Sequence, residues 1–102
     1  APLKNKEQKM REKQIEQKLV QAVRKSGGMC LKFVSPNFDG MPDRLIILPG
    51  GKITFAELKA PGKKPHPLQL ARHKTLIKLG FHVYVIDSIE QIGAILDEIQ
   101  SP

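Results

Sequence analysis

A β-hairpin followed directly by a helix and a further strand limits the folds open to this chain. Two β-prone runs, residues 44–48 and 52–59, are separated only by Pro49-Gly50-Gly51, which is a hairpin signal. Residues 68–79 then have apolar side chains at helical spacing, and residues 81–86 are again β-prone. A strand, a helix and a strand in one sheet imply a right-handed crossover, so the sequence predicts a mixed sheet with one parallel pair.

The remaining segments complete an α-β-β-β-α-β-α order, which is an α/β fold. Residues 3–25 are rich in helix formers and end before Gly27-Gly28, and residues 29–35 are β-prone. The strand at 81–86 has little polarity on either face, so we expect it at the centre of the sheet between helices. The apolar stripe after Ser88 predicts a C-terminal helix.

The length of 102 residues predicts a single domain that spans residues 1–102. A lone cysteine, Cys30, cannot form an internal disulfide, and we expect it to be packed rather than reactive. No apolar run approaches the ~18 residues that a membrane span needs. We therefore expect a cytoplasmic protein with no membrane partner.

Positive charge is concentrated in two blocks. The net charge is +7, with +5 in residues 1–25, +5 in residues 61–80 and −4 in residues 81–102. Lysine and arginine gain affinity for phosphates by releasing counterions, so this polarity favours a polyanionic partner. The alternative is a solvated basic surface without a partner.

Three charged residues of the predicted hairpin suggest chemistry rather than folding. Glu57 and Lys59 lie two positions apart on one strand, so both side chains leave the same face. If the turn has three residues, Leu48 pairs with Lys52 and Asp43 faces Glu57. A turn of two or four residues would place Asp43 on the other face unless a bulge restores the alignment.

Two opposed carboxylates repel each other and need compensation. A hard divalent cation with oxygen ligands supplies it, and Mg²⁺ commonly takes one or two carboxylates while keeping waters and substrate phosphates. Such an ion can activate a water toward a phosphodiester. Lys59 is suited to positioning that water or to neutralising the phosphate. The alternative for Glu57 and Lys59 is an exposed charge pair.

These motifs resemble a known family. Gly40-Met41-Pro42-Asp43-Arg44, Glu57-Leu58-Lys59 and the later Gln69 resemble the PD-(D/E)XK nuclease signature, and more narrowly the VRR-NUC family. The resemblance extends from about Glu16 to the strand at 81–86. It implies an αβββαβ core with a mixed sheet and a C-terminal helix.

The family resemblance also implies an acidic residue on the first helix. Glu16 fits this position because it shares a helix face with Leu19 and Val23, whereas Glu12 and Glu7 are the alternatives. The implied cofactor is Mg²⁺, with Mn²⁺ as a substitute. Its implied ligands are the Glu16 carboxylate, directly or through water, the carboxylates of Asp43 and Glu57, and the Leu58 carbonyl. Gln69 would orient water or substrate.

The implied activity is endonucleolytic hydrolysis of branched DNA, including four-way (Holliday) junctions. A nuclease that acts on flaps, plain duplex or single strands is the alternative within enzymes, and a basic DNA-binding module without catalysis is the alternative outside them. DNA is expected across the first helix and residues 61–80, with the acidic final helix turned away. The expected contacts come from Arg44, Lys63, Lys64 and Arg72. A solvated role is favoured for His73 over contact with a phosphate.

Resolving a four-way junction requires cuts in two strands, and one domain of this size has room for one active site. A homodimer with two-fold symmetry would supply both sites. Met10 and Leu3, which precede the main apolar stripe of the first helix, are the predicted contacts between the two copies.

Overall fold

The computed structural model describes residues 5–102 and has three helices around one four-stranded sheet. The elements are α1 (Asn5–Lys25), β1 (Met29–Lys32), β2 (Arg44–Leu48), β3 (Lys52–Leu58), α2 (Pro67–Lys78), β4 (Val83–Ile86) and α3 (Gln91–Gln100). The sheet order is β1-β2-β3-β4, in which β4 alone runs parallel to its neighbour. The predicted element order and the mixed sheet are confirmed.

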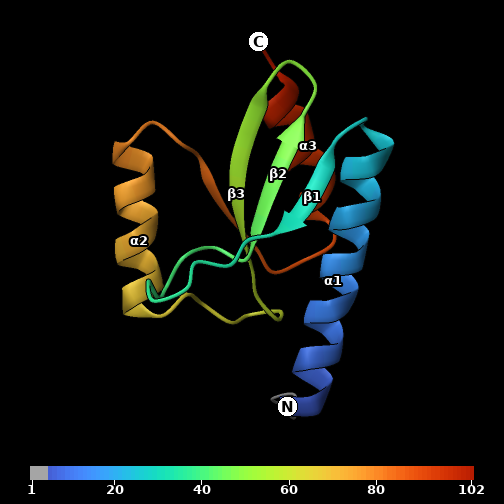
Figure 1. Ribbon diagram of the computed structural model, residues 1–102. Helices are drawn as coiled ribbons and strands as arrows, with labels where there is room; N and C mark the ends of the chain where they lie inside the picture. Colours follow the sequence, from blue (N-terminus) through green and yellow to red (C-terminus); the bar gives the residue numbers. More distant parts are fainter. Residues whose placement is uncertain (1–4) are drawn as a thin grey trace.

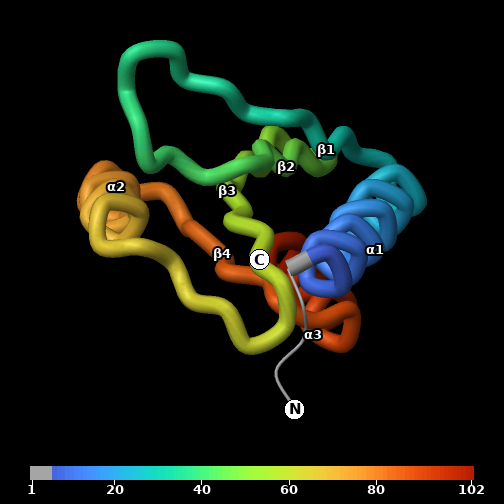
Figure 2. The backbone as a smooth tube through the Cα atoms, turned by 90° about the horizontal axis from the view of Figure 1, so that it is seen from below, coloured from blue at the N-terminus to red at the C-terminus, as the bar shows by residue number. Residues whose placement is uncertain are grey.

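The sheet separates two unequal layers of helix (Figures 1 and 2). Helices α1 and α3 cover one face, and α2 lies against the other. The main core lies on the α1 and α3 side, because even-numbered side chains of β2 and β3 point there. It contains Leu19 and Val23 of α1, Ile46, Leu48, Ala56 and Leu58 of the hairpin, Ile86 of β4, and Ile92 and Leu96 of α3.

The turn between β2 and β3 has the three-residue form. Leu48 pairs with Lys52 and Arg44 pairs with Ala56, so opposed residues have numbers that sum to 100. Gly50 and Gly51 have φ values of 88° and 71°, a region that side chains other than glycine rarely adopt. This register fixes the faces of every residue at the start of β2 and the end of β3.

One prediction about the sheet is wrong: β4 lies at the edge, not at the centre. Strand β4 is apolar because α2 contacts one of its faces and α3 the other. Burial of both faces of a strand depends on the layers above and below and is independent of whether a second strand pairs with it. The apolar composition of residues 81–86 therefore identifies a sandwiched strand but not its place in the sheet order.

Smaller expectations from the sequence have mixed outcomes. Cys30 is packed in the core with 8% exposure, as expected. Strand β1 ends at Lys32 rather than extending to residue 35. Among residues 5–102, no helix combines the length and the apolar character that crossing a membrane requires. Leu3, a predicted dimer contact, lies outside the described residues.

Candidate active site

A cleft opens at the end of the sheet where β2 begins and β3 ends. Its volume is about 610 Å³. The six residues predicted to hold a metal or to act in catalysis all line it, namely Glu16, Asp43, Glu57, Leu58, Lys59 and Gln69. They come from α1, the loop before β2, the end of β3 with the residue that follows it, and α2, so only the folded chain brings them together.

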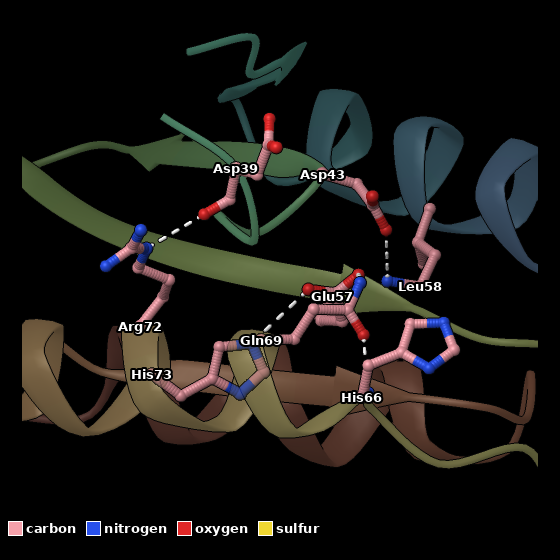
Figure 3. Close-up of polar contacts among 8 residues, drawn as sticks. All are labelled: Asp39, Asp43, Glu57, Leu58, His66, Gln69, Arg72 and His73. Atoms are coloured by element: carbon pink, nitrogen blue, oxygen red, sulfur yellow. Dashed lines mark hydrogen bonds and ion pairs between the residues drawn. The ribbon is translucent and has the colours of Figure 1, made fainter. Parts of the chain in front are cut away.

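Glu57 is the most enclosed charged group of the cleft, with 1% exposure. Helix α2 contacts both oxygens of its carboxyl group (Figure 3). Gln69 donates from Nε2 to Glu57 Oε2 over 3.3 Å, and His73 Nε2 lies 3.3 Å from Glu57 Oε1. Because Gln69 and His73 are four residues apart, they occupy one face of the helix, and together they fix the orientation of the carboxyl group.

Asp43 faces Glu57 from the start of β2. The observed register places these two residues opposite each other by continuing the pair Arg44 and Ala56 by one step. Asp43 Oδ2 accepts a hydrogen bond of 2.8 Å from the backbone N–H of Leu58. One carboxylate oxygen of Asp43 is thus hydrogen-bonded to β3. Asp43 is nevertheless an exposed residue, and it lines the cleft.

Burial and the neighbouring carboxylate make ionisation of Glu57 unfavourable. Desolvation, followed by the negative charge of Asp43, raises the pKa of Glu57 to about 8. Burial also lowers the pKa of His73, and the charge of Lys59 adds to this, although Asp43 acts in the opposite direction. Both shifts favour neutral forms, so without a bound cation the contact between His73 and Glu57 is a neutral hydrogen bond at pH 7.

Glu16 is held by an arginine of the sheet. Arg44 Nη2 lies 2.9 Å from Glu16 Oε2, and Arg44 Nη1 donates to the Cys30 carbonyl over 3.2 Å. Only 11% of the Arg44 side chain is exposed. The guanidinium therefore serves an internal contact between α1 and the sheet, which conflicts with the predicted contact of Arg44 with DNA.

Glu12 also lines the cleft, one helical turn before Glu16. Burial raises the pKa of Glu12, and the negative charge of Asp43 is the next largest cause. The opposing influence of Lys59 is weaker. Two carboxylates of α1 thus line the cleft, and only Glu16 has Arg44 as its ion-pair partner.

The donor set of the cleft fits a hard divalent cation that retains other ligands. Among residues 5–102, no three side chains of His, Cys, Asp or Glu converge closely enough to hold a metal by themselves. Magnesium characteristically takes only one or two protein carboxylates, with waters and phosphate oxygens completing its shell. A carboxyl group as buried as Glu57, whose ionisation the nearby Asp43 carboxylate makes still less favourable, would be compensated by such a cation once it ionises.

Lysines surround this acidic centre. Lys9, Lys13 and Lys32 line the cleft itself, and Lys63 and Lys64 line a neighbouring hollow of about 370 Å³ that shares Lys59 with it. The C-terminal end of α3 lies at the opposite end of the sheet, next to the hairpin turn (Figure 1), where Lys52 donates to the Gln100 carbonyl over 2.8 Å. The acidic residues near the end of α3 are therefore remote from the cleft.

Two predicted residues have different surroundings from those expected. His73 is buried with 6% exposure, whereas a solvated position was favoured. Its position four residues after Gln69 was the available signal, because the two must share a helix face. Arg72 donates from Nε to the Asp39 carbonyl over 2.8 Å and covers the Phe38 ring at 3.8 Å, so it anchors a loop.

Comparison with known proteins assigns the family. No family model matches the chain. The chain is 52% identical over 90 residues to "Putative nuclease p44" of Acyrthosiphon pisum secondary endosymbiont phage 1, which covers 88% of this chain and 96% of that protein. A solved structure described as a VRR_NUC domain superposes with a TM-score of 0.80 and 32% identity over 85% of this chain and 95% of its own. The cleft residues and both relatives agree, and the chain belongs to the VRR-NUC family of nucleases, in its phage type.

Proposed function

We propose that this nuclease is a Mg²⁺-dependent endonuclease that cuts branched DNA, with four-way junctions as its main substrate. The observation that carries the metal dependence is the pair formed by buried Glu57 and exposed Asp43, two carboxylates that face each other at the centre of a basic cleft. When bound, Mg²⁺ would polarise the phosphate and make a bound water more acidic. Mn²⁺ is expected to substitute.

The residues of the cleft have separate roles in this proposal. Asp43, Glu57 and the Leu58 carbonyl hold the cation, and an α1 carboxylate contributes directly or through water. Glu16 is the predicted α1 ligand, and Glu12 is the competing one because it also lines the cleft, where burial and then the charge of Asp43 raise its pKa. Lys59 neutralises charge on the phosphate in the transition state.

Gln69 supports the site from the first turn of α2. Its side-chain oxygen accepts a hydrogen bond of 2.8 Å from the N–H of His66, and its amide nitrogen contacts Glu57. Gln69 therefore couples the start of the helix to the orientation of a metal ligand. Its implied role toward water or substrate would require it to exchange one of these contacts.

The DNA is proposed to lie over the cleft between α1 and the loop that carries Lys63 and Lys64. Both lysines are exposed, and they face a hollow that adjoins the cleft. Contacts to phosphates position DNA without reading its bases, so weak sequence preference is expected. Action on flaps, duplex or single strands remains the alternative substrate range. The phage source of the relative supports a site of action in the cytoplasm of an infected bacterium.

A homodimer is proposed as the active unit, because two cuts in one junction need two sites. The sheet face opposite α1 supports this, since α2 leaves part of it uncovered. Met29, Leu31 and Ile53 on this face are 51%, 43% and 46% exposed. The register joins Met29, Ile47 and Ile53 into one row across three strands. A contiguous apolar surface of this kind is typical of an interface.

The experiment for this function is a cleavage assay on labelled four-way junction, flap, duplex and single-stranded DNA, with Mg²⁺ and with EDTA. Wild type should cut the junction only with Mg²⁺, and Asp43→Asn should bind it without cutting. Asp97→Asn on α3 is the matched control, because it removes the same charge far from the cleft. Cleavage by Asp43→Asn at the wild-type rate, or cleavage in EDTA, contradicts the proposal.

A further inference from the structure

The segment between β1 and β2 forms a loop that closes on the backbone of Asp43, a proposed metal ligand. The N–H of Phe33 donates to the Asp43 carbonyl over 2.7 Å, which brings the two ends of the loop together. Val34 at its start lines the cleft and is 75% exposed. From there the chain extends across to the N-terminal end of α2 and returns (Figures 1 and 2).

Contacts with α2 hold the tip of this loop in place. The Asp39 carbonyl accepts the 2.8 Å hydrogen bond from Arg72, a contact drawn beside Glu57 in Figure 3. At Gly40 the backbone approaches the helix so closely that a Cβ atom there would lie 2.9 Å from Leu68 Cγ. Pro42 is fully buried. The tip is therefore held against the same helix that orients Glu57.

Phe38 is the aromatic residue at this tip, and it is 48% exposed. The guanidinium carbon of Arg72 lies 3.8 Å from the centre of its ring, so a cation covers one face of the ring. The other phenylalanines lie elsewhere, since Phe33, Phe55 and Phe81 form an edge-to-face cluster between the sheet and α2. Phe38 contributes to no core, and it lies on a loop whose two ends, Val34 and Asp43, both line the cleft.

We propose that Phe38, supported by Arg72, is a stacking platform for a DNA base that lacks a stacking neighbour, as at a branch or in a single-stranded flap. Aromatic side chains beside a basic groove bind bases through their π faces, whatever the sequence. In a continuous duplex each base already stacks on its neighbours, so only a base that is unpaired, or that has lost a stacking neighbour at a branch, can use the platform. This inference rests on the proposed function and assigns its preference for branched DNA to one side chain.

The two segments that carry Phe38 and Arg72 also carry residues of the proposed metal site. Asp43 ends the loop whose tip carries Phe38, and α2 contributes both Arg72 and the two residues that contact Glu57. A base held on Phe38 therefore engages the same two segments that position the metal ligands. The phosphate to be cut is expected within a few nucleotides of the branch.

The test is DNA binding in EDTA, where no cleavage occurs, with wild type, Phe38→Ala and Phe38→Trp. The probes are a duplex with a flap of unpaired thymines and a fully paired duplex of equal length, at one fixed salt concentration. Phe38→Ala should weaken flap binding by roughly 10- to 100-fold and leave duplex binding unchanged. Phe38→Trp should retain flap binding. Ile77→Ala removes an exposed apolar side chain near the other end of α2 and should change neither.

Two results overturn the platform. Equal loss of flap and duplex affinity in Phe38→Ala would mean that the residue only supports the loop, and unchanged flap affinity would mean that no base contacts it. Thermal unfolding of each variant shows whether the loop change affects the fold. Failure of wild type to cleave any DNA with Mg²⁺ would contradict the proposed function instead, so the two failures are separate readouts.

Discussion

Glu57 is buried like a core side chain, yet it is also a proposed ligand of a cation. An isolated carboxylate in such a place is unfavourable, and a group of this kind normally stays protonated until a partner arrives. Gln69 and His73 satisfy its oxygens in the metal-free protein. The carboxyl group is therefore oriented in advance, and on the proposed function an arriving cation would exchange with its proton instead of reorganising the cleft.

This exchange predicts a pH dependence of stability in the metal-free protein. The pKa of Glu57 is about 8 in the folded chain and 4.5 in the unfolded chain, so between these values only the folded state keeps the proton. Stability should therefore fall as pH rises through this window, by at most about 1.4 kcal/mol per pH unit. The measurement is chemical denaturation in EDTA between pH 7 and 8, above the ordinary histidine pKa of 6.5, so that the opposite contribution of His73 is small. Glu57→Gln should remove the slope, and equal slopes in both proteins would contradict the prediction.

His73 should act as a positioning residue for metal binding. His73→Ala leaves Glu57 Oε1 without its partner, and loss of such an outer contact typically lowers metal affinity about 10- to 100-fold. Titration calorimetry with Mn²⁺ measures this effect without cleavage. His73→Gln should recover part of it by restoring a donor, and His82→Ala removes an exposed histidine as the control. Unchanged Mn²⁺ affinity in His73→Ala would exclude the role.

At the residue scale, the most informative property of the sequence was the alternation of side chains between the two faces of each strand. It placed Asp43 opposite Glu57 once the turn length was known. The same alternation puts Arg44 on the face of Ile46 and Leu48, toward α1, and this would have predicted its inward position. Its ion pair with Glu16 was not predictable from spacing, since it depends on where α1 crosses the sheet.

The basic loop between β3 and α2 is the element that should set the salt dependence of binding. Lys63→Gln with Lys64→Gln should weaken DNA binding equally across sequences and reduce the salt slope by roughly 0.9 for each lost phosphate contact. Arg72 is kept intact, because it anchors the loop of Phe38. Lys74→Gln with Lys78→Gln removes the same charge from the outer part of α2 and is the control. An unchanged slope in the first pair would place the DNA elsewhere.

At the element scale, turn residues and prolines in the sequence indicated the boundaries of strands and helices. The sequence did not indicate which strands lie next to each other in the sheet. The three-residue turn and the proline-rich loop determined where β3 and α2 begin and end. Pro67, expected in the loop, instead occupies the first turn of α2, where its missing N–H costs nothing. The edge position of β4 could not be predicted, because the apolar pattern of a strand reports only the layers on its two faces.

Across the whole molecule, basic and acidic side chains concentrate at different ends of the sheet, and exposed apolar side chains lie on the sheet face opposite α1. Lysines gather around the cleft at one end of the sheet, and the acidic end of α3 lies at the other. The charge blocks of the sequence predicted only part of this separation, because Asp87 and Glu90 of the acidic block follow β4 at the end of the sheet where Lys59 follows β3. The uncovered apolar face was not predicted, because it depends on how much of the sheet a single helix of twelve residues can cover.

This face leads to the prediction about assembly. In a homodimer that meets through it, Met29→Glu with Ile53→Glu places charges in the interface at positions that are exposed in a single chain, so the fold should persist while the dimer dissociates. Light scattering at micromolar concentration gives the mass, and circular dichroism checks the fold. Wild type should be a dimer, and the double variant a monomer that nicks a junction without paired cuts.

Met10→Glu on α1 provides the comparison, because Met10 is 57% exposed and was the contact expected from sequence. If Met10→Glu dissociates the dimer and the sheet variant does not, the two copies meet through α1. A wild type that is monomeric with and without DNA would remove the paired-cut mechanism altogether. Each chain would then make a single nick, and the apolar face would need another explanation. A dimer sensitive only at Met29 and Ile53 instead fixes the separation of the two clefts, and with it the spacing of the two cuts.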